Sequence, residues 1–253
     1  MNFKIIGLVT ILVITITVIL FFIYSSTNDN NNKQVPFEAD KNLREIEISR
    51  SDYESLLYSS DEKAVVIFPL FTGFAYEKNG FYDYYNKKCD ESCLTIKMNE
   101  TLPLSYNSSQ EAFMLLQLLK YPYLTDLDIE KNPSILKNYD KIILLHSEYV
   151  TRNEFLAITN HPKVIYLYPN ALYAEVSYDK NLNMIKLIRG HGYHNSSINN
   201  GFNWENDNTR PFEYDTDCKD WKFYIIDNGH MLNCYPENVI TKNLDIVRQL
   251  KEL

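Results

Sequence analysis

The sequence predicts an α/β domain that follows an amino-terminal transmembrane helix. Three short apolar runs, typical of strands buried on both faces of a parallel sheet, are separated by segments of helical composition. These runs are residues 64–70 (AVVIFPL), 141–145 (KIILL) and 163–168 (KVIYLY). A strand, a helix and a strand in this order require a right-handed parallel crossover. Ahead of them, residues 5–24 form an apolar run long enough to cross a bilayer.

Residues 5–24 contain no charged side chain, and twenty helical residues span a hydrocarbon core of about 30 Å. A cleavable signal peptide has a shorter apolar run followed by a small-residue cleavage site, whereas here the run is followed by Ser25, Ser26 and Thr27. We therefore interpret residues 1–25 as an uncleaved signal anchor. Lys4 precedes the run and Asp29 is the first charge after it, which favours a cytoplasmic amino terminus. We expect a single-pass plasma-membrane protein whose domain is extracytoplasmic.

The remaining chain divides into a linker and one folded region. Residues 26–42 are polar and of low complexity, which predicts a flexible linker, and residues 43–253 form the α/β domain. We expect helices over 111–120, 152–159 and 243–253, strands over 184–189 and 222–226, a hairpin turn at 227–229 and a loop over 124–133. The last helix should bury Leu244, Val247 and Leu250. Residues 190–253 would form a disulfide-containing carboxyl-terminal extension.

Composition and charge exclude several functions. The net charge is −8, so no excess of cations is present to bind a nucleic-acid backbone. The seven glycines form neither common nucleotide-binding motif. The twenty tyrosines suit half-buried walls, surfaces that bind carbohydrate or aromatic groups and, as phenolates, ferric iron.

The four cysteines fit an oxidising compartment. Cys89 and Cys93 are close in sequence, as are Cys218 and Cys234, so two local disulfides are the simplest pairing. A four-thiolate zinc site is the alternative, but the spacing differs from a double C-x-x-C pattern. A cysteine nucleophile is rejected because no cysteine lies in a small-residue turn between a strand and a helix, and paired thiols are not nucleophilic.

Residues 146–150 (HSEYV) combine a histidine, a carboxylate and a phenol directly after a predicted central strand. Thr151 and Glu154 form a capping-box pattern that begins the next helix. Ligands bind at the carboxyl ends of strands in open α/β sheets, so His146 and Glu148 are candidate catalytic residues. The alternative is that both side chains only bind loop amides or face solvent.

These residues belong to a longer pattern. Tyr139-Asp140 precedes the motif strand and residues 168–173 (YPNALY) follow it, while Ala75-Tyr76, residues 80–82 (GFY) and residues 124–128 (LTDLD) lie upstream. Over residues 65–176 the chain resembles the large subunit of N,N-dimethylformamidase, in its carboxyl-terminal domain. The resemblance implies a class I glutamine amidotransferase-like fold, which is a three-layer α/β sandwich with a mostly parallel central sheet.

The resemblance also implies a metal centre. The family holds a mononuclear iron with two tyrosines and the glutamate of H-x-E, which implies Tyr76, Tyr106 and Glu148 as ligands here. The Arg-Pro that usually precedes the second tyrosine is missing before Tyr106, and the alternatives for that ligand are Tyr82, Tyr84 and Tyr85. Ferric iron bound by hard oxygen donors can polarise an amide carbonyl and acidify a bound water, with His146 shuttling a proton. Packing in the domain wall is the alternative role for Tyr76 and Tyr106.

Two further parts of the sequence have alternative interpretations. Residues 191–194 (HGYH) could bind zinc on a helix, but their glycine neighbours predict a surface loop. Trp204 and Trp221 could line a sugar-binding groove or anchor an irregular segment.

Two functions follow from these patterns. The first is a metal-dependent hydrolase of C–N amide bonds other than peptide bonds, acting on a small amide. The second is a non-catalytic domain that binds a ligand or a cell-envelope partner and retains only the fold. The combination of His146, Glu148 and Tyr149 favours the enzyme, and the missing Arg-Pro favours the binding domain.

Overall fold

The computed structural model of the chain describes residues 46, 48–59, 62–204 and 219–253. The predicted signal anchor and linker, residues 1–42, lie outside these residues. Within the described ranges, no helix is both long and apolar enough to cross a membrane. All described residues belong to one compact unit, 46–253.

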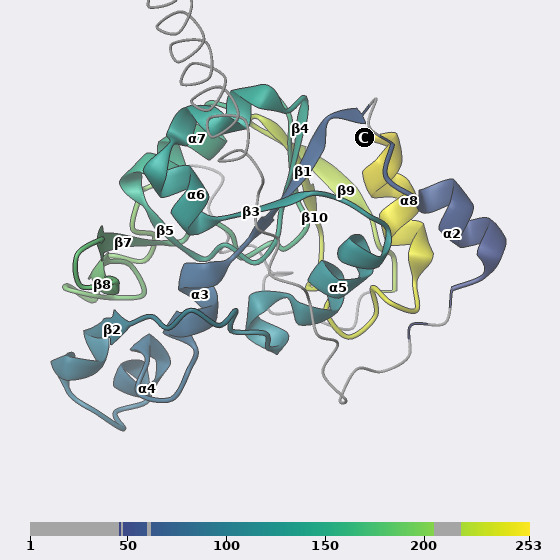
Figure 1. Cartoon of the computed structure of the whole chain (residues 1–253). Coiled ribbons are helices and arrows are strands. Elements are labelled where there is room, and N and C mark those ends of the chain that lie inside the picture. Colours follow the sequence, from purple (N-terminus) through teal and green to yellow (C-terminus); the bar gives the residue numbers. More distant parts are fainter. Residues whose placement is uncertain (1–45, 47, 60–61, 205–218) are drawn as a thin grey trace, which may run out of the picture. The chain divides into compact units, whose positions relative to one another are not determined.

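A six-stranded sheet forms the centre of this unit (Figure 1), in the order β3-β1-β4-β6-β10-β9. Neighbouring strands are parallel throughout, except for the antiparallel pair β10 and β9. The strands are β1 (Ala64–Phe68), β3 (Tyr123–Thr125), β4 (Lys141–Leu144), β6 (Val164–Tyr166), β9 (Phe223–Ile226) and β10 (Gly229–Leu232).

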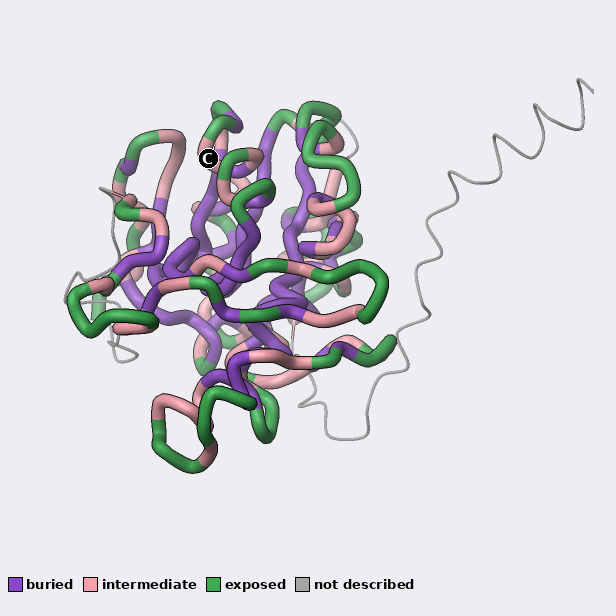
Figure 2. The backbone as a smooth tube through the Cα atoms, turned by 90° about the vertical axis from the view of Figure 1, so that its left-hand side faces the viewer, coloured by how far each residue is buried: buried purple, intermediate pink, exposed green. Residues whose placement is uncertain are grey.

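The central strands are buried on both faces. Val66 and Phe68 of β1 belong to one apolar cluster, and Val65 and Ile67 belong to a second, because alternate side chains of a strand point to opposite faces. Figure 2 shows these strands as buried segments, with exposed loops around them. The first cluster includes residues of α2 (Arg50–Leu56), α3 (Leu70–Ala75), α5 (Gln110–Leu118) and α8 (Leu244–Glu252), and the second includes residues of α6 (Asp126–Lys131), η4 (Pro133–Asn138) and α7 (Arg152–Thr159). The chain therefore has an α/β fold.

A second, four-stranded sheet has the order β2-β8-β7-β5. Its pairs are antiparallel, except for the parallel pair β5 and β7. The strands are β2 (Thr95–Lys97), β5 (Tyr149–Thr151), β7 (Ala174–Asp179) and β8 (Met184–Arg189). Helix α4 (Phe81–Tyr85) and the short helix η2 (Glu91–Leu94) lie between β1 and β2 in the sequence. The short helix η3 (Tyr106–Ser108) follows β2.

Several predicted elements are confirmed. Helix α7 and strand β8 have the predicted bounds, and β4, β6, β9, α5 and α8 lie within or next to their predicted ranges. The hairpin turn at 227–229 connects the antiparallel strands β9 and β10. The closing helix buries Val247 and Leu250 together with Ile246, while Leu244 is only partly buried.

Three predictions are wrong. The segment 124–133 is not a loop, because it contains part of β3 and the whole of α6. Thr125 and Asp128 form a capping box that starts this short helix. The segment 146–150 is not a loop throughout either, since β5 begins at Tyr149 and pairs with β7. Residues 223–232 also belong to the central sheet rather than to an appended extension.

The strand order identifies a place for a ligand. The chain leaves β1 for β3 on one side and later enters β4 on the other side of β1. Such a reversal of strand order is a topological switch point, and open α/β sheets bind ligands beside it, at the carboxyl ends of the strands. The segments that follow β1 and β4 are therefore the first place to look for a site.

Candidate functional site

Tyr76 and Glu148 reach the switch point from these two segments. Helix α3 begins two residues after β1, and Tyr76 is its carboxyl-terminal cap. Glu148 lies between β4 and β5 and is fully buried. The Tyr76 hydroxyl donates a hydrogen bond to Oε2 of Glu148 at 2.7 Å, across 72 residues of sequence.

Tyr82 joins this pair from α4. Its hydroxyl lies 2.5 Å from the hydroxyl of Tyr76 and donates to Oε1 of Glu148 at 3.3 Å. The two tyrosine rings are stacked, with centroids 3.9 Å apart. Gly80 makes this approach feasible, because a Cβ there would lie 2.4 Å from the carbonyl oxygen of Ala75.

His191 is the third donor to Glu148. Its Nε2 donates a short hydrogen bond to Oε1 of the carboxylate. The residue follows β8 and has a φ of 51°, between Gly190 and Gly192 with φ of 127° and 76°. This run of positive φ turns the chain back toward the switch point. The sequence predicted a surface loop for residues 191–194, and this prediction missed the contact between His191 and Glu148. The two flanking glycines were the only local signal of the turn that makes the contact.

His146 contacts the same carboxylate from the other side. It is buried, and its Nε2 lies 3.5 Å from Oε2 of Glu148. Its Nδ1 lies 2.7 Å from the backbone oxygen of Asn107 and 3.0 Å from the Tyr235 hydroxyl. Because a carbonyl oxygen only accepts, we assign the proton to Nδ1. Nε2 then carries a lone pair that has no hydrogen-bond partner among the described residues.

The charges of the site follow from this burial. Burial raises the pKa of Glu148, but His191, His146 and the Tyr76 hydrogen bond oppose it, and the resulting pKa lies below the usual value. Burial lowers the pKa of His146, partly offset by Glu148. Burial and the nearby Glu148 charge raise the pKa values of Tyr76 and Tyr82, so both phenols are protonated donors near neutral pH.

Tyr106, the other predicted ligand, makes no hydrogen bond to Glu148 within the described part of the chain. Its side chain is 41% exposed and its ring stacks on Tyr235, with centroids 5.3 Å apart. Tyr235 is the residue that contacts His146. Among the described residues, the phenols that hydrogen-bond to Glu148 are those of Tyr76 and Tyr82. The structure thus brings together Tyr76, His146 and Glu148, and Tyr106 contacts this group through Tyr235, which lies against His146.

The side-chain oxygens around Glu148 are candidate ligands for a metal ion. In the described part of the chain, no group of three or more His, Cys, Asp or Glu side chains is placed to hold one, so a centre here depends on the two phenols. The oxygens of Tyr76, Tyr82 and Glu148 are 2.5 to 3.3 Å apart. Ligands that share an ion at right angles, with bonds of about 2 Å, lie about 2.8 Å apart. Both the spacing and the hard-oxygen chemistry of this set fit ferric iron.

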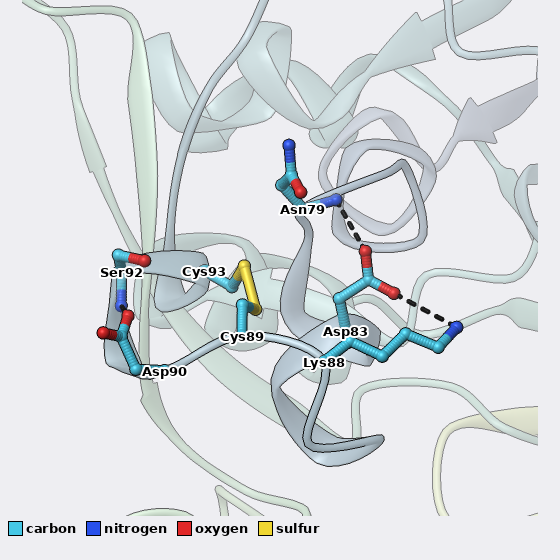
Figure 3. Close-up of a disulfide and its surroundings, with 7 residues drawn as sticks. All are labelled: Asn79, Asp83, Lys88, Cys89, Asp90, Ser92 and Cys93. Atoms are coloured by element: carbon cyan, nitrogen blue, oxygen red, sulfur yellow. Dashed lines mark hydrogen bonds and ion pairs between the residues drawn. A yellow bond between two sulfur atoms is a disulfide. The ribbon is translucent and has the colours of Figure 1, made fainter.

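The predicted disulfide between Cys89 and Cys93 is present (Figure 3). It closes a loop in the segment after α4. Within α4, the Asp83 carboxylate accepts from the backbone amide of Asn79 and pairs with Lys88. Cys218, predicted to pair with Cys234, lies outside the described residues. Trp204 lies against Tyr166, with ring centroids 5.5 Å apart, which supports the anchoring role.

Comparison with known proteins adds no assignment, since no protein-family model matches the chain and no curated protein matches its sequence significantly. The class of the fold is α/β, and the site is a buried carboxylate surrounded by two phenols and two imidazoles. We therefore infer the function from the geometry of this site.

Proposed function

We propose that the chain is a membrane-anchored, extracytoplasmic hydrolase of C–N amide bonds that uses ferric iron held by Tyr76, Tyr82 and Glu148. The observation that carries the proposal is the mutual approach of these three side chains: the two hydroxyl oxygens lie 2.5 Å apart, that of Tyr76 lies 2.7 Å from Oε2 of Glu148, and that of Tyr82 lies 3.3 Å from Oε1. The assignment replaces Tyr106 by Tyr82, one of the alternatives that the sequence left open. Binding of the ion would displace the protons of the two phenols, and the resulting three anionic oxygen donors would balance the charge of a trivalent ion.

The proposal also includes a more specific fold within the α/β class. A parallel sheet covered on both faces, with Glu148 just beyond the strand next to β1, supports the amidotransferase-like three-layer arrangement that the resemblance implies. The resemblance to N,N-dimethylformamidase supports the reaction, because that family hydrolyses a small amide. Fold alone would not support it.

The surrounding residues have separate tasks in this reaction. A bound ferric ion would supply Lewis acidity to an amide carbonyl and acidify a water. The Asn107 carbonyl holds the His146 imidazole with Nε2 directed at the site, so Nε2 can accept the proton of the attacking water and return it to the leaving nitrogen. His191 donates to Glu148 and keeps its carboxylate oriented.

Metal analysis of the full-length chain in detergent tests this proposal. We expect one bound iron per chain, a visible absorption band from phenolate-to-iron charge transfer, and release of amine from small amides that depends on the iron. Glu148→Gln and Tyr82→Phe should lose the band and the iron while the chain stays folded. Tyr106→Phe is the matched control and should retain both. A wild-type chain that binds no iron, or loss of iron in Tyr106→Phe alone, would contradict the assignment.

One observation favours the second candidate, a non-catalytic ligand-binding domain. Both oxygens of Glu148 already accept hydrogen bonds from protein groups, so the carboxylate needs no ion to be satisfied. In that case the wild-type chain would be colourless, and Glu148→Gln would lower stability without changing metal content. The iron content of the wild-type chain therefore distinguishes the two functions.

A further inference from the structure

A groove lies beside the candidate site, between the end of α4 and the loop that carries His191. Its volume is about 440 Å³, within the usual range for small-molecule sites. Its lining includes Tyr84, Tyr85, His191 and Tyr193, with Lys87 and Asp90 also present. Neither the iron assignment nor the proton transfer uses Tyr84, Tyr193, Lys87 or Asp90.

The tyrosine rings of the groove meet edge to face. Tyr84 lies at 67° to Tyr85 and at 89° to Tyr193, with centroids 5.7 and 6.1 Å apart. All three rings are partly exposed. A further ring can contact the exposed parts of these rings in the same way, because aromatic pairs prefer edge-to-face or offset contact at centroid distances of 4.5–7 Å.

The groove is continuous with the candidate site through His191. This imidazole lines the groove and also donates to Glu148. Its ring contacts Tyr85 at a centroid distance of 5.3 Å. A molecule in the groove therefore lies next to the residues proposed to act on an amide.

We propose that this groove binds the aromatic ring of an aryl amide, with the ring held between Tyr84, Tyr85 and Tyr193 and the amide directed past His191 toward Glu148. This inference rests on the proposed function, since it names the substrate class of the same site. The groove is far larger than a one-carbon amide requires, and its walls provide rings rather than a dense set of polar groups.

Two other ligand classes fit the groove less well. An alkylammonium ion would gain from the ring faces, but the groove offers it no net negative charge, because the Asp90 carboxylate in its lining is matched by the Lys87 ammonium. A sugar would need several fixed polar partners for its hydroxyls, whereas the charged partners here are Lys87 and Asp90, and both are exposed.

Calorimetric titration of the full-length chain in matched detergent tests the inference, with benzamide, acetamide, tetramethylammonium and methyl glucoside as probes. We expect benzamide to bind at least about ten-fold more tightly than the other three. Tyr84→Leu and Tyr193→Leu should each weaken benzamide binding by about ten-fold. Tyr53→Leu on α2, a partly buried tyrosine outside the groove, should leave it unchanged.

Iron content separates this inference from the proposed function. Tyr84→Leu and Tyr193→Leu should keep the iron of the wild-type chain, because neither residue contacts Glu148 in the hydrogen-bond network of the described residues. An iron-bound chain that binds benzamide no better than acetamide overturns the aryl-amide inference and leaves the metal assignment standing. An iron-free chain that binds benzamide selectively overturns the metal assignment and keeps the groove as an aromatic-ligand site. Preferred binding of tetramethylammonium or methyl glucoside overturns the inference in favour of that class.

Discussion

Glu154 and Asp126 bring their carboxyl groups together in the core, and outside this pair no group of the described residues donates a hydrogen bond to either oxygen of Glu154. Both residues are fully buried. Asp126 accepts from the backbone amide of Phe71 at 2.5 Å, but its other oxygen also lacks a donor. Two carboxylates this close cannot both be charged, so the pair shares a proton. This proton links α7 to the start of α3, the helix that leads to Tyr76.

The acid pair predicts that stability falls as the pH rises. Burial raises the pKa of Asp126 to about 7 and, with the Asp126 charge, raises the pKa of Glu154 well above its usual value. In the unfolded chain both groups ionise near about pH 4. Between about pH 4 and 7 the folded state thus holds more protons than the unfolded state, and the free energy of unfolding should fall by about 1 kcal/mol per proton per pH unit.

Glu154→Gln tests this dependence. The amide can donate to Asp126 at every pH, so the variant should show a shallower decline and should gain stability relative to wild type between pH 5 and pH 8. Urea unfolding at the two pH values measures the difference. Glu252→Gln, an exposed change on α8, should follow the wild-type curve. Parallel curves for wild type and Glu154→Gln would show that no proton is shared.

Gly190→Ala should damage the His191 loop more than Gly192→Ala. Both glycines have positive φ, so each change strains the backbone by about 1 kcal/mol. A Cβ on Gly190 would also lie 2.7 Å from the Cβ of Ala174, whereas a Cβ on Gly192 has no neighbour nearer than 3.7 Å. We expect Gly190→Ala to lose a further 1 kcal/mol or more, roughly, through this clash. Thermal unfolding of the two variants measures it, and equal losses would contradict the packing argument.

Removal of the disulfide should loosen the groove. The Cys89–Cys93 bond closes a short loop, for which the chain-entropy relation gives about 2 kcal/mol of stabilisation. Cys89 also lines the groove. The double variant Cys89→Ser with Cys93→Ser should lose about that much stability and bind benzamide more weakly. Chemical reduction is a poorer test because it would also break the predicted disulfide between Cys218 and Cys234. Unchanged benzamide affinity would show that the loop does not shape the groove.

Membrane attachment is predicted from residues 1–25 alone. The full-length chain should stay in the membrane fraction after a carbonate wash, and protease added outside the cell should degrade the domain. Deletion of residues 1–25 should release the chain. Val13→Arg, at the middle of the apolar run, should reduce membrane insertion at a cost of about 3 kcal/mol, and Val13→Leu is its control. A wild-type soluble form beginning near Ser26 would refute the anchor.

The sequence by itself determined the α/β class, the central strands, helix α7 and the position of Glu148 after β4. These features depend on local signals, namely apolar runs and the Thr151 cap, whose hydroxyl accepts from the Glu154 backbone amide. The reciprocal half of the predicted capping box does not form, because the Glu154 carboxyl group interacts with Asp126 instead. The short helix α6 was missed because six residues carry too little periodicity to distinguish a helix from a loop.

Only the tertiary structure decided which side chains surround Glu148. Tyr82 meets Glu148 across 66 residues and His191 meets it across 43, through contacts that no local pattern encodes. The turn at Gly80, where a Cβ would meet the carbonyl oxygen of Ala75, brings α4 against the end of α3 and Tyr82 to Glu148. His191 arrives by a turn with three successive positive φ angles, which the sequence marks only by two glycines. A buried carboxylate takes its partners from whichever backbone segments the fold brings within hydrogen-bond distance, and that distance is set by packing rather than by spacing along the chain.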